Sequence, residues 1–323
     1  MDKIFFPTFW ISFFASAGVF IPALIGFFGV RTKIVKTEVA DYLSELVIYI
    51  TLPLMIFTHI IDEFSFSTLR YWWVFPLVSF GMIVISYFLA SVLIRIIGYE
   101  RNQMEFKMLV SFQNSGYLPL ALASALLKQE EAGMGILYII FFLMGFNLLI
   151  WSWGVHMFKN RRANVEFSWT RLFSPPFLAV LFSLILVLIG AERIIPEIIL
   201  KQFRAFGNTT VPLGMFIVGA SLANSKFLVK LDRGILGIIF LRLIIIPSLF
   251  LSFLYILRIP YLTAFVILLE ASMPSATSLA VIATVYGGNR EYISQGILFT
   301  HLISFVTIPL FLSLFNIIFK ISG

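Results

Sequence analysis

Cysteine is absent from this sequence, and charged residues are few. Of its 323 residues 12% are charged, whereas about a quarter are charged in a soluble domain. The lack of cysteine excludes disulfides, thiolate nucleophiles and zinc thiolate sites. Hydrophobic residues make up 60% of the chain and its mean hydropathy is +1.00, so an ordinary soluble domain is excluded as well. The sequence predicts an all-α polytopic membrane protein.

Ten apolar runs are long enough to be transmembrane helices in a window of about 19 residues. Short connections separate them and leave no room for a soluble domain. Two segments of mixed charge and hydrophobicity, 38–46 and 195–206, are expected to lie at the interface as amphipathic helices. The tryptophans near span ends, Trp151 among them, are expected to anchor there too. The predicted spans are 7–30, 44–61, 71–97, 107–127, 133–158, 172–190, 205–223, 234–257, 261–286 and 292–319.

The formal net charge of +7 does not indicate a nucleic-acid partner. The basic residues lie singly in the connections between apolar runs, where cytoplasmic lysine and arginine normally accumulate. The connections after the odd-numbered spans carry more of them than those on the opposite side. The positive-inside rule therefore predicts that both termini lie outside, for a multi-pass protein of a bacterial inner membrane.

Two spans are interrupted by proline and polar residues at corresponding points of the two halves. Pro119 lies in SFQNSGYLPLALASALL and Pro274 in LLEASMPSATSLAVIA. Pro53 and Pro212 form a second matched pair. With five spans per half, repeats must be inverted relative to each other. The alternative to an internal repeat is that the prolines match by chance, but the matched polar residues argue against it. Paired broken helices of this kind are typical of the midplane binding site of secondary transporters.

The broken helices predict a small polar chamber where they meet. Proline lacks an amide hydrogen and clashes with the carbonyl four residues earlier, so we expect Pro119 to free the carbonyl of Ser115 and Pro274 that of Glu270. Half-helix N-termini favour an anion, and free carbonyls at half-helix C-termini favour a cation. We therefore expect an anionic substrate beside a coupling cation.

The residues around both breaks are the candidate substrate ligands. Asn114 carries donors and an acceptor that suit a carboxylate, and its alternative role is to cap the freed backbone. Tyr117 offers a hydroxyl, although an aromatic residue inside a span more often packs. The candidates are Gln113, Asn114, Ser115, Gly116, Tyr117 and Pro119 at the first interruption, and Ser272, Met273, Pro274, Ser275 and Thr277 at the second.

Charged and titratable residues inside the spans are candidates for coupling. Glu270 lies deep in the ninth span and predicts either a sodium site or a proton carrier. Alternatively, Glu270 forms a structural ion pair with Arg242. If the two are not paired, Arg242 is a candidate charge partner for an anionic substrate. Thr300 and His301 belong to a polar stripe that either faces the chamber or forms a helix contact, and Asn147 has the same two interpretations. No cofactor is expected apart from a sodium ion or proton.

The motifs ITLPLMIF, NSGYLPL, VPLGMFIVGASLA and MPSATS, in this order across ten spans, resemble the auxin efflux carrier family over essentially the whole chain. The resemblance implies a fold related to that of the bile acid sodium symporters, with substrate bound where spans 4 and 9 cross and moved by an elevator motion. Asn114 matches the family's crossover asparagine, and Pro119 and Pro274 match its crossover prolines. Glu270 resembles the sodium-binding glutamate of the bile acid symporters. The short connection 159–171 resembles prokaryotic members rather than plant auxin carriers.

The resemblance also divides the chain into scaffold and transport parts. The expected partners are a small organic anion, the lipid bilayer and a second copy of the chain bound through the scaffold, and no nucleic acid. The predicted segments are 1–70 (scaffold, spans 1 and 2), 71–158 (transport, spans 3 to 5), 159–171 (cytoplasmic linker), 172–233 (scaffold, spans 6 and 7) and 234–323 (transport, spans 8 to 10).

A secondary-active carrier of small organic anions, such as mono- or dicarboxylates, is the function we expect. The first alternative is a sodium-coupled symporter of a larger amphipathic acid, and the second is a channel or sensor on the same fold. An enzyme is not indicated, because His59, His156 and His301 stand apart, no H-E-x-x-H motif occurs, and Glu270 has no second deep carboxylate beside it.

Overall fold

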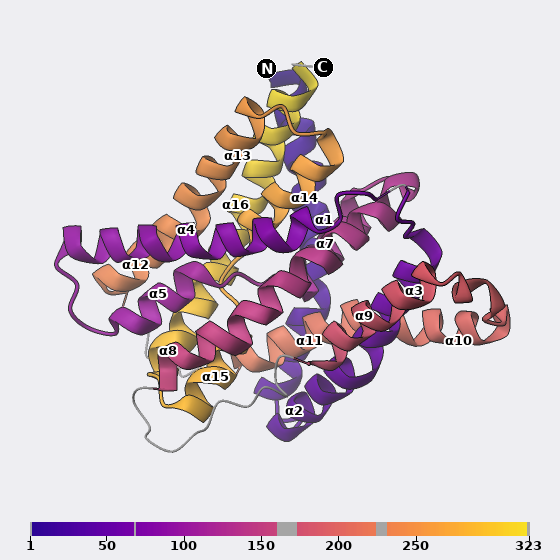
Figure 1. Ribbon diagram of the computed structural model, residues 1–323. Coiled ribbons are helices and arrows are strands. Elements are labelled where there is room, and N and C mark those ends of the chain that lie inside the picture. Colours follow the sequence, from indigo (N-terminus) through magenta and orange to yellow (C-terminus); the bar gives the residue numbers. More distant parts are fainter. Residues whose placement is uncertain (1, 68, 160–172, 224–230, 322–323) are drawn as a thin grey trace.

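The computed structural model describes residues 2–67, 69–159, 173–223 and 231–321, which form helices and no strand (Figure 1). Seven helices in these residues are long and apolar enough to cross a membrane, and three shorter apolar helices accompany them. The chain is therefore an all-α polytopic membrane protein, as predicted. The count of ten crossings and the inverted repeat stay predictions. The predicted linker 159–171 lies, except for Lys159, outside the described residues.

The helices of the two predicted scaffold segments pack against one another. α1 lies along α11, and α3 contacts both α9 and α10. The two segments predicted as amphipathic helices are the helices α2 and α10. The elements are α1 (Asp2–Arg31), α2 (Thr37–Leu46), α3 (Leu52–Glu63), α9 (Pro175–Leu188), the 3₁₀ turn η4 (Ala191–Ile194), α10 (Glu197–Gly207) and α11 (Thr210–Ala223).

Two glycines allow α1 and α11 to approach closely. A side chain at Gly26 would collide with the carbonyl of Phe216, and one at Gly219 would collide with the carbonyl of Ala23. Because lipid removes the hydrophobic drive for helices to associate, small residues at a contact increase the van der Waals gain by bringing the backbones together. The contact between α1 and α11 thus depends on the absence of side chains at these positions.

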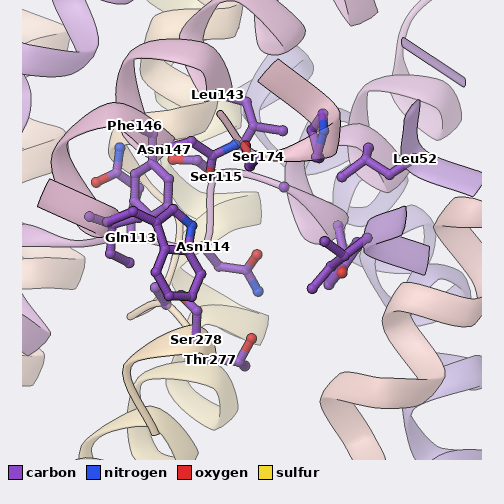
Figure 2. Close-up of a pocket in the computed structure, with 17 residues that line it drawn as sticks. Leu52, Gln113, Asn114, Ser115, Leu143, Phe146, Asn147, Ser174, Thr277 and Ser278 are labelled. Atoms are coloured by element: carbon purple, nitrogen blue, oxygen red, sulfur yellow. The ribbon is translucent and has the colours of Figure 1, made fainter. Parts of the chain in front are cut away.

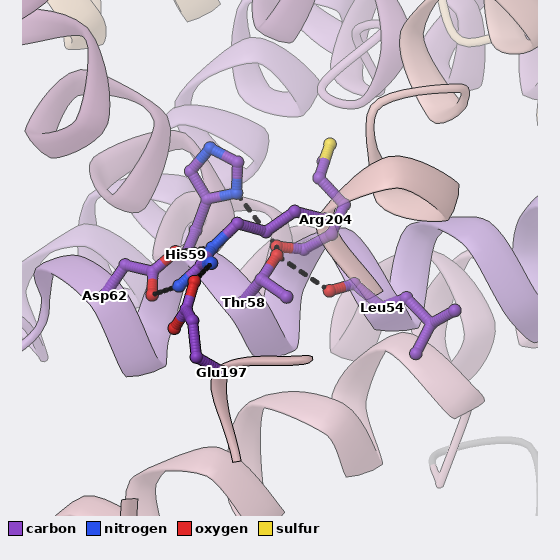
Figure 3. Close-up of polar contacts among 7 residues, drawn as sticks. Leu54, Thr58, His59, Asp62, Glu197 and Arg204 are labelled. Carbon is purple, nitrogen blue, oxygen red and sulfur yellow. Dashed lines mark hydrogen bonds and ion pairs between the residues drawn. The ribbon is translucent and has the colours of Figure 1, made fainter. Parts of the chain in front are cut away.

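An ion-pair cluster joins α10 to α3 (Figure 3). Arg204 donates from Nε and Nη2 to the two carboxylate oxygens of Asp62, at 2.7 Å each, and from Nη1 to Glu197 at 2.5 Å. About a third of the Arg204 side chain is exposed (33%). Exposed ion pairs contribute only about 0 to 1 kcal/mol. The two-pronged geometry therefore orients α10 on α3 more than it stabilises the fold.

The helices of the two predicted transport segments form the remainder of the structure. α4 packs on α7 and α5, and α16 contacts α12, α14 and α15. The elements are α4 (Val74–Ile97), α5 (Gln103–Ser111), α6 (Tyr117–Leu126), α7 (Gln129–Leu149), α8 (Val155–Lys159), α12 (Arg233–Phe240), α13 (Ile246–Ile256), α14 (Tyr261–Ala271), α15 (Ser278–Tyr286) and α16 (Arg290–Ile321).

Three π-helical turns interrupt α-helices in the described part of the chain. Pro53 and Pro247 lie two residues after the ends of two of them, and a proline loosens the turn before it by clashing with the carbonyl four residues earlier. In the third, the hydroxyl of Ser152 donates to the carbonyl of Leu148 and competes with the helical hydrogen bond. Such turns are frequent at functional sites. They are η1 (Val47–Thr51), η2 (Ile150–Gly154) and η5 (Leu241–Ile245).

The two ends of the chain lie side by side. α1 and α16 run antiparallel, so the start of α1 and the end of α16 meet at the top of Figure 1. The rings of Phe13 and Phe20 both contact the ring of Phe305, with centroids 4.8 and 5.6 Å apart. Both termini are therefore on one side of the helix bundle, and which side of a membrane this is stays a prediction.

Candidate functional site

The helices broken in the sequence pattern are broken in the structure, and the breaks lie side by side. Between α5 and α6 the chain is not helical over residues 112–116, the first break. Between α14 and α15 it is not helical over residues 272–277, the second break. The two breaks run antiparallel and pair through their backbones. The pairing hydrogen bonds run from Asn114 N to Pro274 O at 2.7 Å and from Ala276 N to Phe112 O at 2.8 Å.

The prolines mark the breaks, but Pro274 does not act as predicted. Pro119 lies in the first turn of α6, where a missing amide hydrogen removes no helical hydrogen bond. Pro274 lies within the second break itself. The carbonyl of Glu270 is not free, because the amide of Met273 donates to it at 3.3 Å. The prediction that Pro274 releases this carbonyl is wrong, since α14 has already ended at Ala271.

The guanidinium of Arg242 binds carbonyl groups from both broken spans. Its Nε donates to Met273 O at 2.9 Å, its Nη1 to Val110 O at 3.2 Å and its Nη2 to Ala271 O at 2.5 Å. Val110 and Ala271 lie in the last turns of α5 and α14, where carbonyls have no donor within the helix. The π turn η5 carries Arg242, which is completely buried. This side chain therefore closes the C-terminal ends of two half-helices.

Glu270 lies in the last turn of α14 and is also completely buried. Neither carboxyl oxygen has a partner with hydrogen-bonding geometry in the described part of the chain. The hydroxyl of Ser115 and the guanidinium of Arg242 interact with it electrostatically. The described residues contain no direct ion pair between Glu270 and Arg242, because the guanidinium nitrogens are bonded to carbonyls instead. The predicted structural pair is thus an interaction through space.

A cavity of about 130 Å³, which we call the small cavity, lies between the breaks, α7 and the scaffold helices (Figure 2). The side chains of the first break lie across it from Leu52 of the scaffold. Gln113 Oε1 and Ser115 Oγ have no partner with hydrogen-bonding geometry in the part of the chain that the structure describes. The lining residues are Ile48, Leu52, Gln113, Asn114, Ser115, Gly116, Tyr117, Leu143, Phe146, Asn147, Ile150, Trp151, Ser174, Pro176, Ala276, Thr277 and Ser278.

The second break uses most of its polar groups internally. Ser275 donates from its hydroxyl to Leu109 O at 2.6 Å and from its amide to Thr300 Oγ1 at 3.2 Å. The hydroxyl of Ser272 donates to Leu268 O at 2.8 Å. These serines satisfy buried backbone groups instead of facing the small cavity. Of the predicted substrate ligands, Gln113, Asn114, Ser115, Gly116, Tyr117 and Thr277 line the small cavity, whereas Pro119, Ser272, Met273, Pro274 and Ser275 do not.

His301 binds Asn114 with its Nε2 and the helix backbone with its Nδ1. Nδ1 lies 2.9 Å from the carbonyl of Ile297, and a carbonyl only accepts, so Nδ1 carries the hydrogen. In the neutral ring Nε2 is then an acceptor, and Asn114 Nδ2 donates to it at 3.3 Å. We assign the tautomer from this geometry. One hydrogen of the Asn114 amide is therefore used, while its second hydrogen and its Oδ1 are available to a ligand.

A second cavity, the large cavity of about 470 Å³, lies between α1, α11 and α16. Its walls are apolar except for His301, and they include Leu24 and Leu302, whose side chains are exposed. Since Asn114 lines the small cavity and His301 the large one, their hydrogen bond forms part of the wall between the two. His301 thus contacts the first break from the side of the large cavity instead of lining the small cavity. Thr300 contacts the second break.

Tyr117, the first residue of α6 after the first break, contacts the scaffold helix α11. Its ring lies against Gly214, and a side chain at Gly214 would overlap the ring atoms. α6 also contacts α1. The small cavity is therefore bounded by helices from both predicted parts of the protein.

The sequence profile of a family described as membrane transport protein matches residues 12–312. The chain belongs to this family. It is the family of the auxin efflux carriers, so the resemblance noted in the sequence is confirmed. An uncharacterized transporter of Methanocaldococcus jannaschii is 29% identical over 303 residues, covering 90% of this chain and 95% of that protein. An uncharacterized transporter of Methanothermobacter thermautotrophicus is 26% identical over 298 residues, covering 90% and 94%. The protein is a membrane transporter and not an enzyme.

Sequence reasoning missed several residues that build the candidate site of this transporter. Trp151, predicted to anchor at the membrane interface, lines the small cavity. Ile48 reaches the cavity from η1 and Trp151 from η2, while η5 positions Arg242, so all three π turns of the described residues contribute to the site. The prolines after η1 and η5 were the available signal. Glu105, just outside the predicted fourth span, is a further buried acid and accepts from the amide of Asn289 at 2.8 Å.

Proposed function

We propose that this transporter is a secondary-active carrier of small organic anions, principally carboxylates, which bind in the small cavity. The observation that carries the proposal is the convergence of two helix N-termini on that cavity. Gly116 and Tyr117 at the start of α6, and Thr277 and Ser278 at the start of α15, all line it. The first amides of a helix have no acceptor within the helix, and each N-terminus carries roughly half a positive charge. Such ends bind anions.

The side chains around the small cavity suit a carboxylate without adding charge. Asn114 has a free hydrogen on its amide, and among the described residues the hydroxyl of Ser115 has no partner with hydrogen-bonding geometry. Gln113 donates to Met82 Sδ at 3.4 Å, which is a weak bond that a ligand can replace. No lysine or arginine of the described residues lines the cavity. The substrate's charge is therefore balanced by helix dipoles, which suits release as well as binding.

The size of the small cavity favours a short acid over the larger amphipathic acid of the rival hypothesis. Its volume of about 130 Å³ is close to the roughly 150 Å³ of an engineered cavity that holds benzene. An acid with a few carbon atoms fits this space. A molecule with several fused rings does not.

Walls from both predicted parts support transport by an elevator motion. Leu52 and Pro176 of the scaffold segments present apolar surfaces toward the polar first break. A substrate held by the breaks would move with them past such a surface, because it makes few bonds to the scaffold. We place this carrier in the inner membrane with both termini outside, and with a second copy bound through the scaffold.

Uptake by purified protein in liposomes tests the proposed function. A thermal-shift screen of mono- and dicarboxylates first selects the acid that stabilises the protein most. We then expect saturable counterflow of the labelled acid, equal with and without a sodium gradient. Transport that requires the gradient would support the sodium-coupled symporter instead, and conduction without counterflow would support a channel. The absence of both binding and counterflow for every acid would reject the proposal.

A further inference from the structure

The C-terminal ends of the half-helices α5 and α14 meet at one buried cation. Helix C-termini carry roughly half a negative charge each, and their last carbonyls lack donors. A free carbonyl buried away from water costs free energy, so this meeting point requires donors or a positive ion. Here the donors are the three nitrogens of the Arg242 guanidinium, each bonded to a different carbonyl.

The same carbonyl oxygens are suitable ligands for a metal cation. Hard cations prefer backbone carbonyls and carboxylates, and the carboxylate of Glu270 interacts electrostatically with the guanidinium that binds the three carbonyls. Arg242 is fully buried and its guanidinium fills this position. A sodium ion at the same oxygens would have to displace at least one guanidinium hydrogen bond and would lie against a fixed positive charge.

We propose that Arg242 is a built-in cation, which holds the two breaks together and takes the position where a coupling sodium ion would otherwise bind. The inference rests on the proposed carrier function and extends that function. With Arg242 in this position, no sodium ion is needed to assemble the binding site. Arg242 acts as a positioning residue: it shapes the breaks through their backbone and does not touch the substrate. Its nitrogens are occupied, and it does not line the small cavity.

The competing role for Arg242 is direct binding of the substrate anion, which the sequence left open. That role requires a guanidinium nitrogen facing the small cavity. The structure instead directs all three nitrogens to Val110, Ala271 and Met273, on the side of the breaks where their helices end. The anion site and the cation site therefore lie at opposite helix ends of the same two breaks.

Thermal unfolding and hydrogen exchange of the full-length protein in detergent test the inference without any substrate. We compare Arg242→Ala and Arg242→Lys with the wild type, using Arg204→Ala on the scaffold as the matched control. Each protein is measured in equal concentrations of sodium, potassium, choline or methylguanidinium chloride. Hydrogen exchange is followed at the amides of residues 112–116 and 272–277 by mass spectrometry.

We expect Arg242→Ala to lower Tm by roughly 5 to 10 °C and to speed exchange at both breaks at least tenfold, while Arg204→Ala leaves both breaks unchanged. Methylguanidinium should restore about half of the loss, sodium should stabilise this variant more than choline does, and neither should affect the wild type. Arg242→Lys keeps the charge with fewer directed donors, so its Tm should lie between those of the wild type and Arg242→Ala.

Two results would overturn the inference. One is a wild type that sodium stabilises by more than about 2 °C relative to potassium and choline, since a ligand that binds the folded state raises Tm. The other is an Arg242 variant whose breaks exchange as slowly as those of the wild type. If Arg242→Ala does not fold, the wild type and Arg242→Lys still decide between the outcomes. Because none of these measurements uses an organic acid, they are independent of the counterflow experiment that tests the proposed function.

Discussion

The two breaks look alike in the sequence, since each combines a proline with several small polar residues inside an apolar span, yet the structure uses them differently. The first break presents Gln113, Asn114 and Ser115 to the small cavity (Figure 2). The second break directs Ser272 and Ser275 to backbone carbonyls. One break therefore offers unpaired polar atoms to a ligand, and the other satisfies most of its polar atoms within the protein, with Thr277 as the exception that lines the cavity.

The neighbours of each break explain this difference. The second break is enclosed by α5, α16 and η5, which supply Leu109 O, Thr300 Oγ1 and the guanidinium of Arg242 as partners. The first break faces apolar side chains, such as Leu52 and Leu143, that form no hydrogen bonds. A polar residue becomes available for binding when the surrounding protein leaves it unpaired. The number of polar residues in a segment is a poorer guide.

Asn114→Ala should have the largest effect on binding if the first break holds the substrate. Loss of a hydrogen bond to a charged group should weaken the affinity for the carboxylate by roughly 1 to 3 kcal/mol. Isothermal calorimetry on the purified protein measures this directly. Asn316→Ala, at a half-buried asparagine whose Oδ1 accepts from Tyr261, is the matched control. Equal affinities for Asn114→Ala and the wild type would remove the first break from the site.

Gly214→Ala should slow transport by roughly tenfold, because the added methyl group overlaps the ring of Tyr117 and overpacking costs about 1 to 3 kcal/mol. Here α6, which directly follows the first break, contacts the scaffold. Gly81→Ala, where a methyl group meets no neighbour within 4 Å, is the control. Counterflow rates in liposomes provide the measurement. Unchanged rates in both variants would show that this contact plays no part in transport.

Ser275→Ala should lower the free energy of unfolding by about 1 to 2 kcal/mol, since it leaves the buried carbonyl of Leu109 without this donor. Ser272→Ala should change stability by less, because the amide of Ser272 still donates to the carbonyl of Leu268. Denaturant unfolding compares the two variants. Neither should change substrate affinity more than about threefold. A large loss of affinity in Ser275→Ala would erase the contrast between the breaks.

Glu270→Gln should have the smallest effect on binding. The carboxyl group lies outside the small cavity and has no partner with hydrogen-bonding geometry among the described residues, so we expect affinity within about threefold of the wild type. We also expect uptake to lose any response to a pH gradient, because the amide cannot carry a proton. Uptake with an imposed gradient measures this. A response that persists in Glu270→Gln would assign the carboxyl a structural role beside Arg242.

Local composition predicted much of the fold and part of the site. Apolar runs marked the helices, and the polar residues around Pro119 and Pro274 marked the breaks. The predicted role of Pro274 failed, since α14 ends at Ala271, before this proline. Trp151 was assigned to the membrane interface because the sequence shows that it lies near the end of a span. The sequence does not show the π turn that carries Trp151 to the small cavity. Periodicity in an apolar sequence does not distinguish a π turn from an α turn.

The sequence by itself determined that this chain is a bundle of membrane helices, because burying so many apolar side chains in lipid requires helices that satisfy their own backbones. It also determined where two of those helices break. Only the tertiary structure decided which polar groups stay unpaired and which cation closes the helix ends. Those outcomes depend on partners far apart in the chain, such as Leu109 for Ser275 and Val110 for Arg242, and their proximity arises only when the helices pack.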